Sequence, residues 1–479
     1  MFKRRVIGLI GLSLLGVFQF ACNTSIEAPE QPNFIFIYAD NLGYGDIGCF
    51  GSELHRTPHI DKMAKEGISL TTLYSSSGVC TPSRASLLTG CYAQRVDMHL
   101  NGKGSWVLFP LSAKGLNPEE ITIASLLKDN GYSTACIGKW HLGDQPEFLP
   151  SNYGFDYFYG IPYSEDMVPS HNPSWPDLPL LQNDKVIEAP VDLTTTTKRY
   201  VKEAIRFITE NRDQPFFLYF PHNLPGSRKV PVVNDDFLDK SANSSYGDAI
   251  EEIDWSVGEL MNTIVKLGIE KRTMIVFTSD NGSPKGRAGS SGRGSNEPFS
   301  GAGYSTMEGG MRVPCVVQWP GTIPAGISND ELCTMMDWLP TFALLAGAQM
   351  PHDRIIDGKN IWSLISGEKN TKSPHEFFNY YFMDQLQAVR DSKWKLHLPL
   401  DNKYDSGDKN KFYGSSELRL IDLSTDFKEE YDVSGMHPEV VQSLLGHAEK
   451  IRKELGDSNY KGEKIRSAKY IDNPKALLK

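Results

Sequence analysis

Two apolar stretches that each lead into an Asp-Asn pair constrain the fold of this chain more than any other feature. Residues 34–38 (FIFIY) precede Asp40-Asn41, and residues 274–278 (MIVFT) precede Asp280-Asn281. An uninterrupted apolar run of this length is typical of a parallel strand that is buried on both faces. Ligands of open α/β sheets bind outside the carboxyl ends of the strands, so we expect these polar pairs to mark a functional edge of one sheet.

The rest of the first two thirds of the chain alternates between strand-like and helix-like stretches. Apolar strands are expected at residues 132–137 and 216–220, and helical spacing covers residues 121–130 and 246–267. This alternation predicts an α/β fold in which a large mixed, mostly parallel sheet is sandwiched by helices.

The pattern changes after about Gly367. Residues 377–382, 394–398 and 418–421 alternate like half-buried strands, and residues 438–455 are amphipathic with helical spacing. We therefore expect a smaller C-terminal antiparallel sheet plus helix in residues 368–479, packed on a main domain of residues 32–367.

The first 22 residues have the pattern of a secretory signal. A basic start, Lys3-Arg4-Arg5, precedes an apolar run at residues 6–20 that is shorter than the roughly 20 residues of a membrane-spanning helix. Cys22 resembles the lipid-modified cysteine of a bacterial lipoprotein. We expect a signal in residues 1–22, a tether in residues 23–31, and an exported protein of the periplasm or outer membrane whose membrane contact is a lipid anchor at Cys22. The alternative is an ordinary cleaved signal in which Cys22 is incidental.

The overall charge restricts the partners. The chain has 49 Lys and Arg against 59 Asp and Glu, a formal net charge of −10, which argues against nucleic acid as a partner. Hydrophobic residues make up 40% and charged residues 23%, as in an ordinary globular protein. An anionic small substrate would therefore need cations gathered at its own site.

The residues that end the two apolar strands are candidate metal ligands. Asp40, Asn41, Asp280 and Asn281 offer hard oxygen donors, and Ca²⁺ is the favoured ion where amide oxygens take part. The alternative for each pair alone is a turn after a strand.

One of the seven cysteines stands apart from the others. The set shows no regular spacing that indicates disulfides or a zinc knuckle, so most are expected as buried thiols. Cys80, however, lies in the polar segment 75–84 (SSSGVCTPSR), directly before the helix-like residues 85–90.

Five segments together resemble the type I sulfatases of the alkaline phosphatase superfamily. Each alone is weakly specific, but five in the order of that family are far more so. They are residues 39–46 (ADNLGYGD), 80–84 (CTPSR) followed by 88–90 (LTG), 138–143 (GKWHLG), 279–282 (SDNG) and 308–314 (EGGMRVP).

The resemblance implies that a formylglycine-generating enzyme, or maturase, is a partner and oxidises Cys80 to Cα-formylglycine. One hydroxyl of the hydrated aldehyde would attack the sulfur of a sulfate ester in line. The second, once deprotonated, would expel sulfate and restore the aldehyde. It also implies one Ca²⁺ that lowers the pKa of the diol. The implied ligands are Asp40, Asn41, Cys80, Asp280 and Asn281.

Three further residues acquire roles from the same resemblance. Arg84 would hold the diol, Lys139 would place a positive charge on a sulfate oxygen, and His141 would donate to the diol or take its proton. Lys139 and His141 are two apart, so on an extended segment they would project to the same side. The alternative is a surface lysine and a packed histidine.

The sequence departs from the family at four positions. Asn41 stands in place of a carboxylate, Cys91 in place of an arginine, Gly226 in place of a histidine, and Gly303 in place of a lysine. The loss of the histidine and lysine together removes charge stabilisation worth a few kcal/mol unless other groups replace them.

Replacements are available nearby. We expect His222 to act on the leaving group, and Arg228, Lys229 and Arg293 to join Lys139 in binding the substrate; Lys285 and Arg287 lie in the same loop as Arg293. The alternative for the loop residues is solvated surface charge.

These observations predict an exported sulfatase that hydrolyses sulfate esters of a sulfated oligosaccharide or polysaccharide. Two alternatives stay open: a catalytically weakened relative that binds sulfated sugars, and a phosphate or phosphonate ester hydrolase of the same superfamily. A phosphate monoester dianion demands more cations than this site retains, which favours sulfate.

Overall fold

The computed structural model describes residues 31–284, 294–400, 417–458 and 460–478. The expected signal at residues 1–22 with Cys22, nearly all of the tether, and Arg293 lie outside these ranges. Within them, no helix combines the length and the apolar character that crossing a membrane requires.

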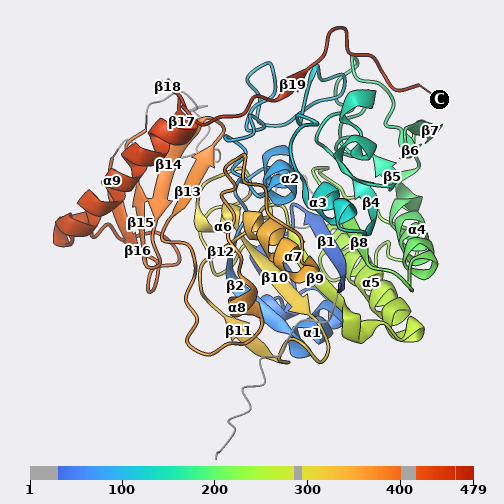
Figure 1. Ribbon diagram of the computed structural model, residues 1–479, viewed down its shortest axis with the longest axis horizontal. Coiled ribbons are helices and arrows are strands. Elements are labelled where there is room, and N and C mark those ends of the chain that lie inside the picture. The colour runs from blue at the N-terminus through green and yellow to red at the C-terminus, as the bar shows by residue number, and fades with distance from the viewer. Residues whose placement is uncertain (1–30, 285–293, 401–416, 459, 479) are drawn as a thin grey trace, which may run out of the picture.

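A large sheet forms the centre of the molecule (Figure 1). Its order is β11-β2-β10-β9-β1-β8-β4-β5-β6-β7, with β12 also on β2. The parallel centre consists of β9 (Thr273–Ser279), β1 (Asn33–Asp40), β8 (Phe216–Pro225), β4 (Ser133–Lys139) and β5 (Tyr157–Ile161). The flanks are β10 (Arg312–Gln318), β2 (Ile68–Tyr74), β11 (Ile327–Asn329), β12 (Cys333–Thr334), β6 (Leu180–Gln182) and β7 (Lys185–Glu188). Antiparallel pairs at β10 and β6 make the sheet mixed.

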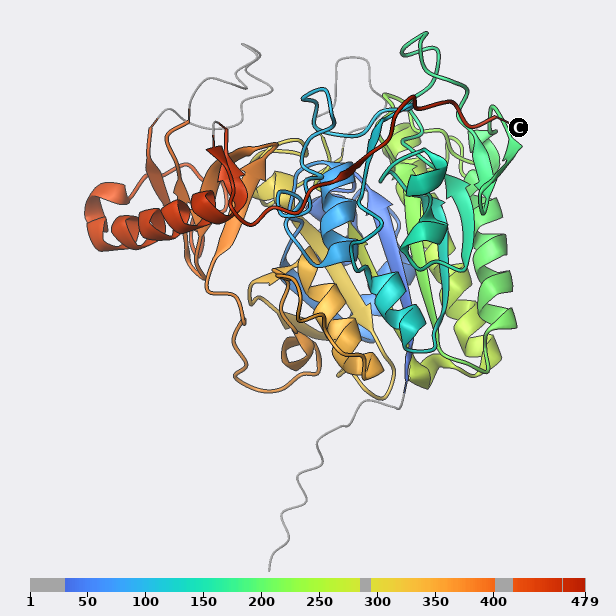
Figure 2. The same cartoon turned by 45° about the horizontal axis from the view of Figure 1, so that its top comes forward.

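Helices cover both faces of this sheet (Figure 2). Phe34, Phe36 and Tyr38 of β1 belong to one core, and the intervening Ile35 and Ile37 belong to the other. The first core includes residues of α2 (Cys80–Thr89), α3 (Ile123–Asp129) and α7 (Trp338–Ala346). The second includes residues of α1 (Pro58–Lys65), α4 (Thr196–Glu210) and α5 (Ser244–Leu267). This arrangement confirms the predicted fold class.

The helix α2 is fixed at both ends by its sequence. It follows Val79, which is extended, and Pro82 is tolerated in its first turn because those N–H groups have no partner within a helix. It stops at Gly90, whose φ of +65° favours glycine. Every residue of α2 is buried, so its first residue, Cys80, is held rigidly at the sheet edge.

A second, four-stranded antiparallel sheet lies beside the first. It consists of β13 (Phe378–Phe382), β14 (Gln385–Arg390), β15 (Trp394–His397) and β16 (Arg419–Asp422). The amphipathic helix α9 (Pro438–Leu455) shares a core with it. The expected C-terminal sheet plus helix is thus present, while the domain limit at residue 367 stays a prediction.

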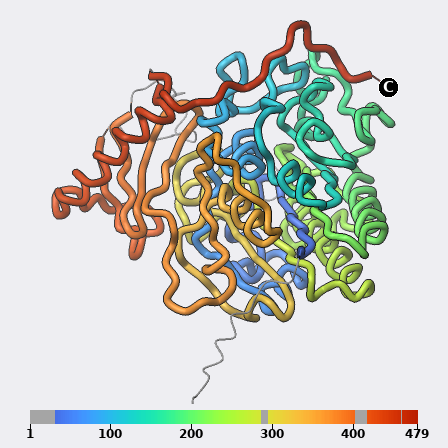
Figure 3. The backbone as a smooth tube through the Cα atoms, in the orientation of Figure 1, coloured from blue at the N-terminus to red at the C-terminus, as the bar shows by residue number. Residues whose placement is uncertain are grey.

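The chain runs back over the main domain after α9, as the smooth trace of Figure 3 shows. Short strands β17 (Gly456–Asp457) and β18 (Tyr460–Lys461) form a hairpin, and β19 (Lys469–Tyr470) then pairs with β3 (Lys114–Gly115). The Lys475 backbone N–H also donates to Gln145 at 2.8 Å. Two further short helices are α6 (Glu308–Met311) and α8 (Trp362–Ile365).

A buried ion network joins the C-terminal sheet to α6. Lys395 of β15 lies 3.1 Å from Glu308 and 3.0 Å from Glu429, and all three side chains are fully buried. Glu429 also accepts from the Glu308 backbone N–H at 2.7 Å and from His397 at 2.7 Å. The network therefore fixes the segment that precedes α6 against the second sheet.

We expect Lys395→Met to destabilise the fold by about 3–5 kcal/mol, because it removes the buried ammonium that lies nearest to both Glu308 and Glu429. Urea unfolding followed by circular dichroism measures this. The matched control is Lys393→Met, directly before the same strand: the Lys393 side chain is 47% exposed and pairs with Asp422 at 3.1 Å, so its loss should cost less than about 1 kcal/mol. Equal unfolding midpoints for the two variants would show that the buried network does not hold the sheets together.

Candidate active site

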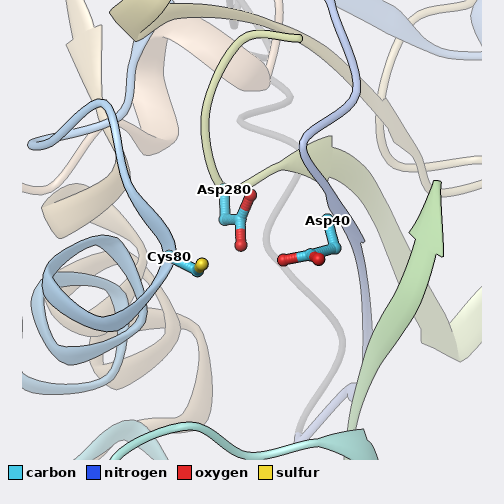
Figure 4. Close-up of side chains that lie close together, drawn as sticks. All are labelled: Asp40, Cys80 and Asp280. Carbon is cyan, nitrogen blue, oxygen red and sulfur yellow. The ribbon is translucent and has the colours of Figure 1, made fainter. Parts of the chain in front are cut away.

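The carboxyl ends of β1 and β9 and the start of α2 meet at one point. Ala39 pairs with Ser279 in the parallel register, so Asp40 and Asp280 follow side by side. Figure 4 shows both carboxylates and the Cys80 side chain facing a common space. One ligand atom from each of Asp40, Cys80 and Asp280 lies within 4.8 Å of the others.

The two asparagines join the carboxylates in one network. The Asn41 backbone N–H donates to Asp280 at 2.9 Å, and the Asn281 amide donates to Asn41 Oδ1 at 2.7 Å. Asn41 has a φ of +63°, which turns the chain sharply after β1. The structure therefore brings all five residues expected as metal ligands to one place.

This donor set fits a hard divalent cation. Asp40 and Asp280 supply carboxylate oxygens, and the asparagines add amide oxygens, which suits Ca²⁺. Asn281 Oδ1 is buried without a hydrogen-bond partner, a costly state for a polar atom unless a ligand satisfies it. Asp40, Asn41, Asp280 and Asn281 together with residue 80 can therefore hold the ion.

Arg84 and Lys139 balance the buried carboxylates. The Arg84 guanidinium donates to Asp40 at 3.0 Å and to Asp280 at 2.8 Å, and its Nε has no partner. Burial disfavours its charge, but attraction to Asp280 and Asp40 raises the pKa of Arg84 well above its usual value. The Nε–H of Arg84 is thus a hydrogen-bond donor for which no acceptor is found among the described residues. The expected contact of Arg84 with a diol at residue 80 stays a prediction.

Lys139 ends β4 with its ammonium in the same cluster. Its Nζ donates to both oxygens of Asp40 at 2.8 Å and to Ser164 at 3.0 Å. Burial works against its charge, but attraction to Asp40 prevails and raises the pKa of Lys139. The lysine is therefore a fixed positive charge, and the alternative of a surface lysine is wrong.

His141 is placed by a turn and not by an extended segment. Its φ is +65°, so the expectation that it and Lys139 project from an extended chain is wrong. Its Nε2 lies 2.9 Å from the Leu108 carbonyl, which can only accept, so Nε2 carries the proton. Burial, and then the charge of Lys139, lower the pKa of His141 well below its usual value. Nδ1 is buried without a partner, so this neutral histidine is suited to accept a proton and not to donate one.

The other residues expected at the site hydrogen-bond to groups outside the carboxylate cluster or are exposed. His222 is buried, with its Nε2 3.0 Å from Ser256 of α5, and burial lowers its pKa to about 3. These contacts do not support its expected action on a leaving group, which stays a prediction. Arg228 donates to the backbone oxygen of Glu165 at 2.7 Å and is half-buried, while Lys229 is exposed. Their substrate roles, like that of Arg293 outside the described residues, stay predictions.

Three groups near the predicted residues were not expected from the sequence. Ser164 and Glu165 follow β5 and lie beside Lys139, with Glu165 Oε2 at 3.9 Å from its Nζ. They could have been found by the rule that singled out Asp40, because they are polar residues at the end of an apolar strand. Arg466 could not: it reaches Cys91 Sγ at 3.3 Å from the far end of the chain, where no motif surrounds it.

We expect calcium affinity to depend on pH through Asp280. Burial, and then the charge of Asp40, raise the pKa of Asp280 to about 7 in the metal-free protein. Below that pH a bound ion must displace a proton, so affinity should fall by up to about tenfold per pH unit below 7 and level off above it. Calorimetric Ca²⁺ titration of chelator-treated protein at pH 5.5, 6.5 and 7.5 measures this. Constant affinity over that range would contradict an Asp280 ligand.

Comparisons with known proteins agree with this geometry. A family model described as sulfatase matches residues 32–348, and a second, described as the C-terminal part of N-sulphoglucosamine sulphohydrolase, matches residues 305–453. Steryl-sulfatase of Mus musculus is 36% identical over 437 residues, which cover 76% of this chain and 69% of the relative. Arylsulfatase A of Homo sapiens is 37% identical over 458 residues, which cover 88% of each chain.

Solved structures extend the likeness. The PsFucS1 sulfatase from Pseudoalteromonas sp. has a TM-score of 0.77 at 26% identity, covering 88% of this chain and 91% of that one. The structure of Ps i-CgsB in complex with k-i-k-neocarrahexaose has a TM-score of 0.74 at 28% identity, covering 91% of this chain and 95% of that one. The site geometry, the family match and the curated relatives together show that the chain belongs to the sulfatase family, whose members are sulfuric ester hydrolases.

Proposed function

We propose that this sulfatase acts on sulfate esters of a sulfated glycan, uses one Ca²⁺, and carries Cα-formylglycine at position 80. The observation that carries the proposal is the seat of Cys80, at the first turn of a buried helix and within 4.8 Å of ligand atoms of both Asp40 and Asp280. Solved relatives include one in complex with k-i-k-neocarrahexaose, which supports a glycan as the substrate class.

The unmodified thiol is poorly suited to the chemistry. Burial, and then the nearby carboxylates against the opposing charge of Lys139, raise the pKa of Cys80 far above its usual value. A protonated thiol is neither a nucleophile nor a metal ligand. An aldehyde hydrate at this position would instead offer two hydroxyl groups. The electrostatics of the site therefore support the modification.

The surrounding residues supply the remaining functions. When bound, the cation would act as a Lewis acid on the diol and on sulfate oxygens. Lys139 offers a fixed positive charge to the sulfate, and His141 Nδ1 is free to take the hydroxyl proton. The first turn of α2 adds backbone N–H groups and the positive end of its dipole.

The charge balance favours sulfate over phosphate esters. In the described part of the chain, the cations nearest Cys80 are Lys139 and Arg84, and both are already paired with Asp40 or Asp280. A sulfate ester carries one negative charge and a phosphate monoester two, so the second would meet a deficit of cations. The phosphate and phosphonate alternative would be supported only by faster turnover of a phosphorylated sugar than of its sulfated counterpart.

We expect peptide mass spectrometry of protein made with a maturase to show that residue 80 has lost sulfur and gained oxygen. Cys80→Ala should abolish hydrolysis of a sulfated saccharide, and Cys80→Ser should bind it with almost no release of sulfate, because a serine adduct lacks the second hydroxyl. Cys49→Ser is the matched control, since Cys49 is exposed and should keep full activity. Active protein with an unmodified Cys80 would contradict the proposal, and unmodified, inactive protein that binds sulfated sugars would support the weakened relative.

We also propose that the enzyme is exported and lipid-anchored through Cys22. The support is the basic start and apolar run of residues 1–20. Bacterial expression of the full chain should place it in the membrane fraction after signal cleavage, and Cys22→Ser should release it to a soluble or uncleaved form. A wild type that stays in the cytosol would contradict export.

A further inference from the structure

Lys139 occupies both oxygens of Asp40, one of the carboxylates expected to bind the cation. Asp40 Oδ1 accepts from Lys139 at 2.8 Å and from Arg84 at 3.0 Å. Asp40 Oδ2 accepts from Lys139 at 2.8 Å and from the Asn41 amide at 3.5 Å. Each carboxylate oxygen has two lone-pair positions, so these four hydrogen bonds fill the group. A cation can therefore bind Asp40 only where one of these donors gives way.

Lys139 is the donor that a cation displaces most easily. Arg84 is held by two further hydrogen bonds, to Asp280 at 2.8 Å and to the Lys139 carbonyl at 2.8 Å, and the Asn41 amide carries no charge. The Lys139 ammonium is a compact charge on a flexible stem, and a divalent ion at Asp40 would repel it. We therefore expect the ammonium to leave at least one oxygen of Asp40 when a cation binds there.

A second buried carboxylate lies within reach of the same ammonium. Glu165 Oε2 is 3.9 Å from Lys139 Nζ, and both side chains are buried. Ser164 bridges the two groups, because its hydroxyl accepts from Lys139 Nζ at 3.0 Å and donates to Glu165 Oε2 at 2.9 Å. A charged N–H···O hydrogen bond has a length of about 2.8 Å, so a shift of the ammonium by about 1 Å would pair it directly with Glu165.

The loop after β8 holds this carboxylate in position. The Ser227 backbone N–H donates to Glu165 Oε1 at 2.6 Å, and the Arg228 guanidinium donates to the Glu165 backbone oxygen at 2.7 Å. Gly226 leaves room for the carboxylate, since a Cβ there would lie 2.4 Å from Oε1. In the described part of the chain, both donors to the carboxylate are neutral, a serine hydroxyl and a backbone N–H. A buried carboxylate without a cationic partner is costly, and Lys139 is the cation near enough to supply one.

We propose that Glu165 is a positioning residue that takes over the Lys139 ammonium from Asp40 when a divalent cation binds there. This inference rests on the proposed function, which includes one Ca²⁺. Lys139 then keeps its positive charge within the site and changes only its partner. Glu165 thereby removes the competition between the ammonium and the cation for Asp40.

Calorimetric Ca²⁺ titration of chelator-treated protein tests this role. Burial, against the attraction of Lys139, raises the pKa of Glu165 to about 7, so the titration is run at pH 8, where this carboxylate is ionised. Glu165→Gln keeps the size of the side chain and removes its charge. We expect it to weaken Ca²⁺ binding on the order of tenfold, because Lys139 then has no second carboxylate and competes with Ca²⁺ for Asp40.

The neighbouring carboxylate provides the matched control. Asp166 is half-buried and follows Glu165 directly, but among the described residues it forms no ion pair with Lys139. Asp166→Asn removes the same charge from almost the same place, so it reports the general attraction of this region for a cation. We expect it to change the Ca²⁺ affinity less than about twofold. Thermal unfolding of both variants without Ca²⁺ reports whether the fold is kept.

A crystal structure of the wild type with Ca²⁺ bound tests the shift without any variant. We expect Lys139 Nζ to lie within about 3.2 Å of Glu165 Oε2 and to donate to at most one oxygen of Asp40. A Lys139 that still donates to both oxygens of Asp40 beside the bound ion would overturn the inference.

Two results of the titration would also overturn it. One is a Glu165→Gln protein that binds Ca²⁺ as tightly as the wild type, and the other is an equal loss of affinity in Asp166→Asn. In both cases the wild type binds Ca²⁺, so the proposed metal site would stand. A wild type that binds no Ca²⁺ would instead overturn the metal site of the proposed function, and this inference with it.

Discussion

The site depends on the burial of two carboxylates around one guanidinium. Arg84 of α2 reaches Asp40 at the end of β1 and Asp280 after β9, with all three side chains fully buried, and Lys139 at the end of β4 neutralises Asp40 further. Leaving a buried charge unpaired costs several kcal/mol, so these elements pack in the arrangement that pairs them. The same pairing fixes the start of α2, and with it residue 80, beside the oxygen atoms that can bind a cation.

Few cationic side chains lie near residue 80 in the described part of the chain, and this shortage restricts the anions that the site can bind. Glycines at 226 and 303 let the backbone approach Glu165 and Gly282, which excludes longer cationic side chains from those positions. In the described part of the chain, the site holds two paired cations, a neutral histidine that accepts a proton at Nδ1, and the hydroxyl of Ser227, which lies 3.1 Å from the Asn41 amide nitrogen. Such a set suits a monoanionic ester, because neutral donors stabilise partial charge without the need for counter-ions.

Much of the fold and of the metal cluster could be predicted because local patterns encode them. The apolar runs became β1 and β9, and the amphipathic stretch at residues 438–455 became α9. Other features could not be read from local patterns. The turn at His141, the contact of His222 with Ser256, and the approach of Arg466 to Cys91 each depend on a partner far away in the chain or on a backbone angle that no side-chain pattern specifies.

Residue type and periodicity are enough to identify the candidates for the chemistry: strand-end carboxylates and amides, a cysteine at a helix start, and a Lys-x-His segment. How these residues interact with one another became visible only in the folded chain. It showed that Arg84 serves both carboxylates, that His141 presents an Nδ1 without a partner, and that Ser227 accepts a hydrogen bond from the Asn41 amide. The physical reason is that hydrogen-bond direction and burial depend on atoms brought together from opposite parts of the chain, and no single segment contains that information.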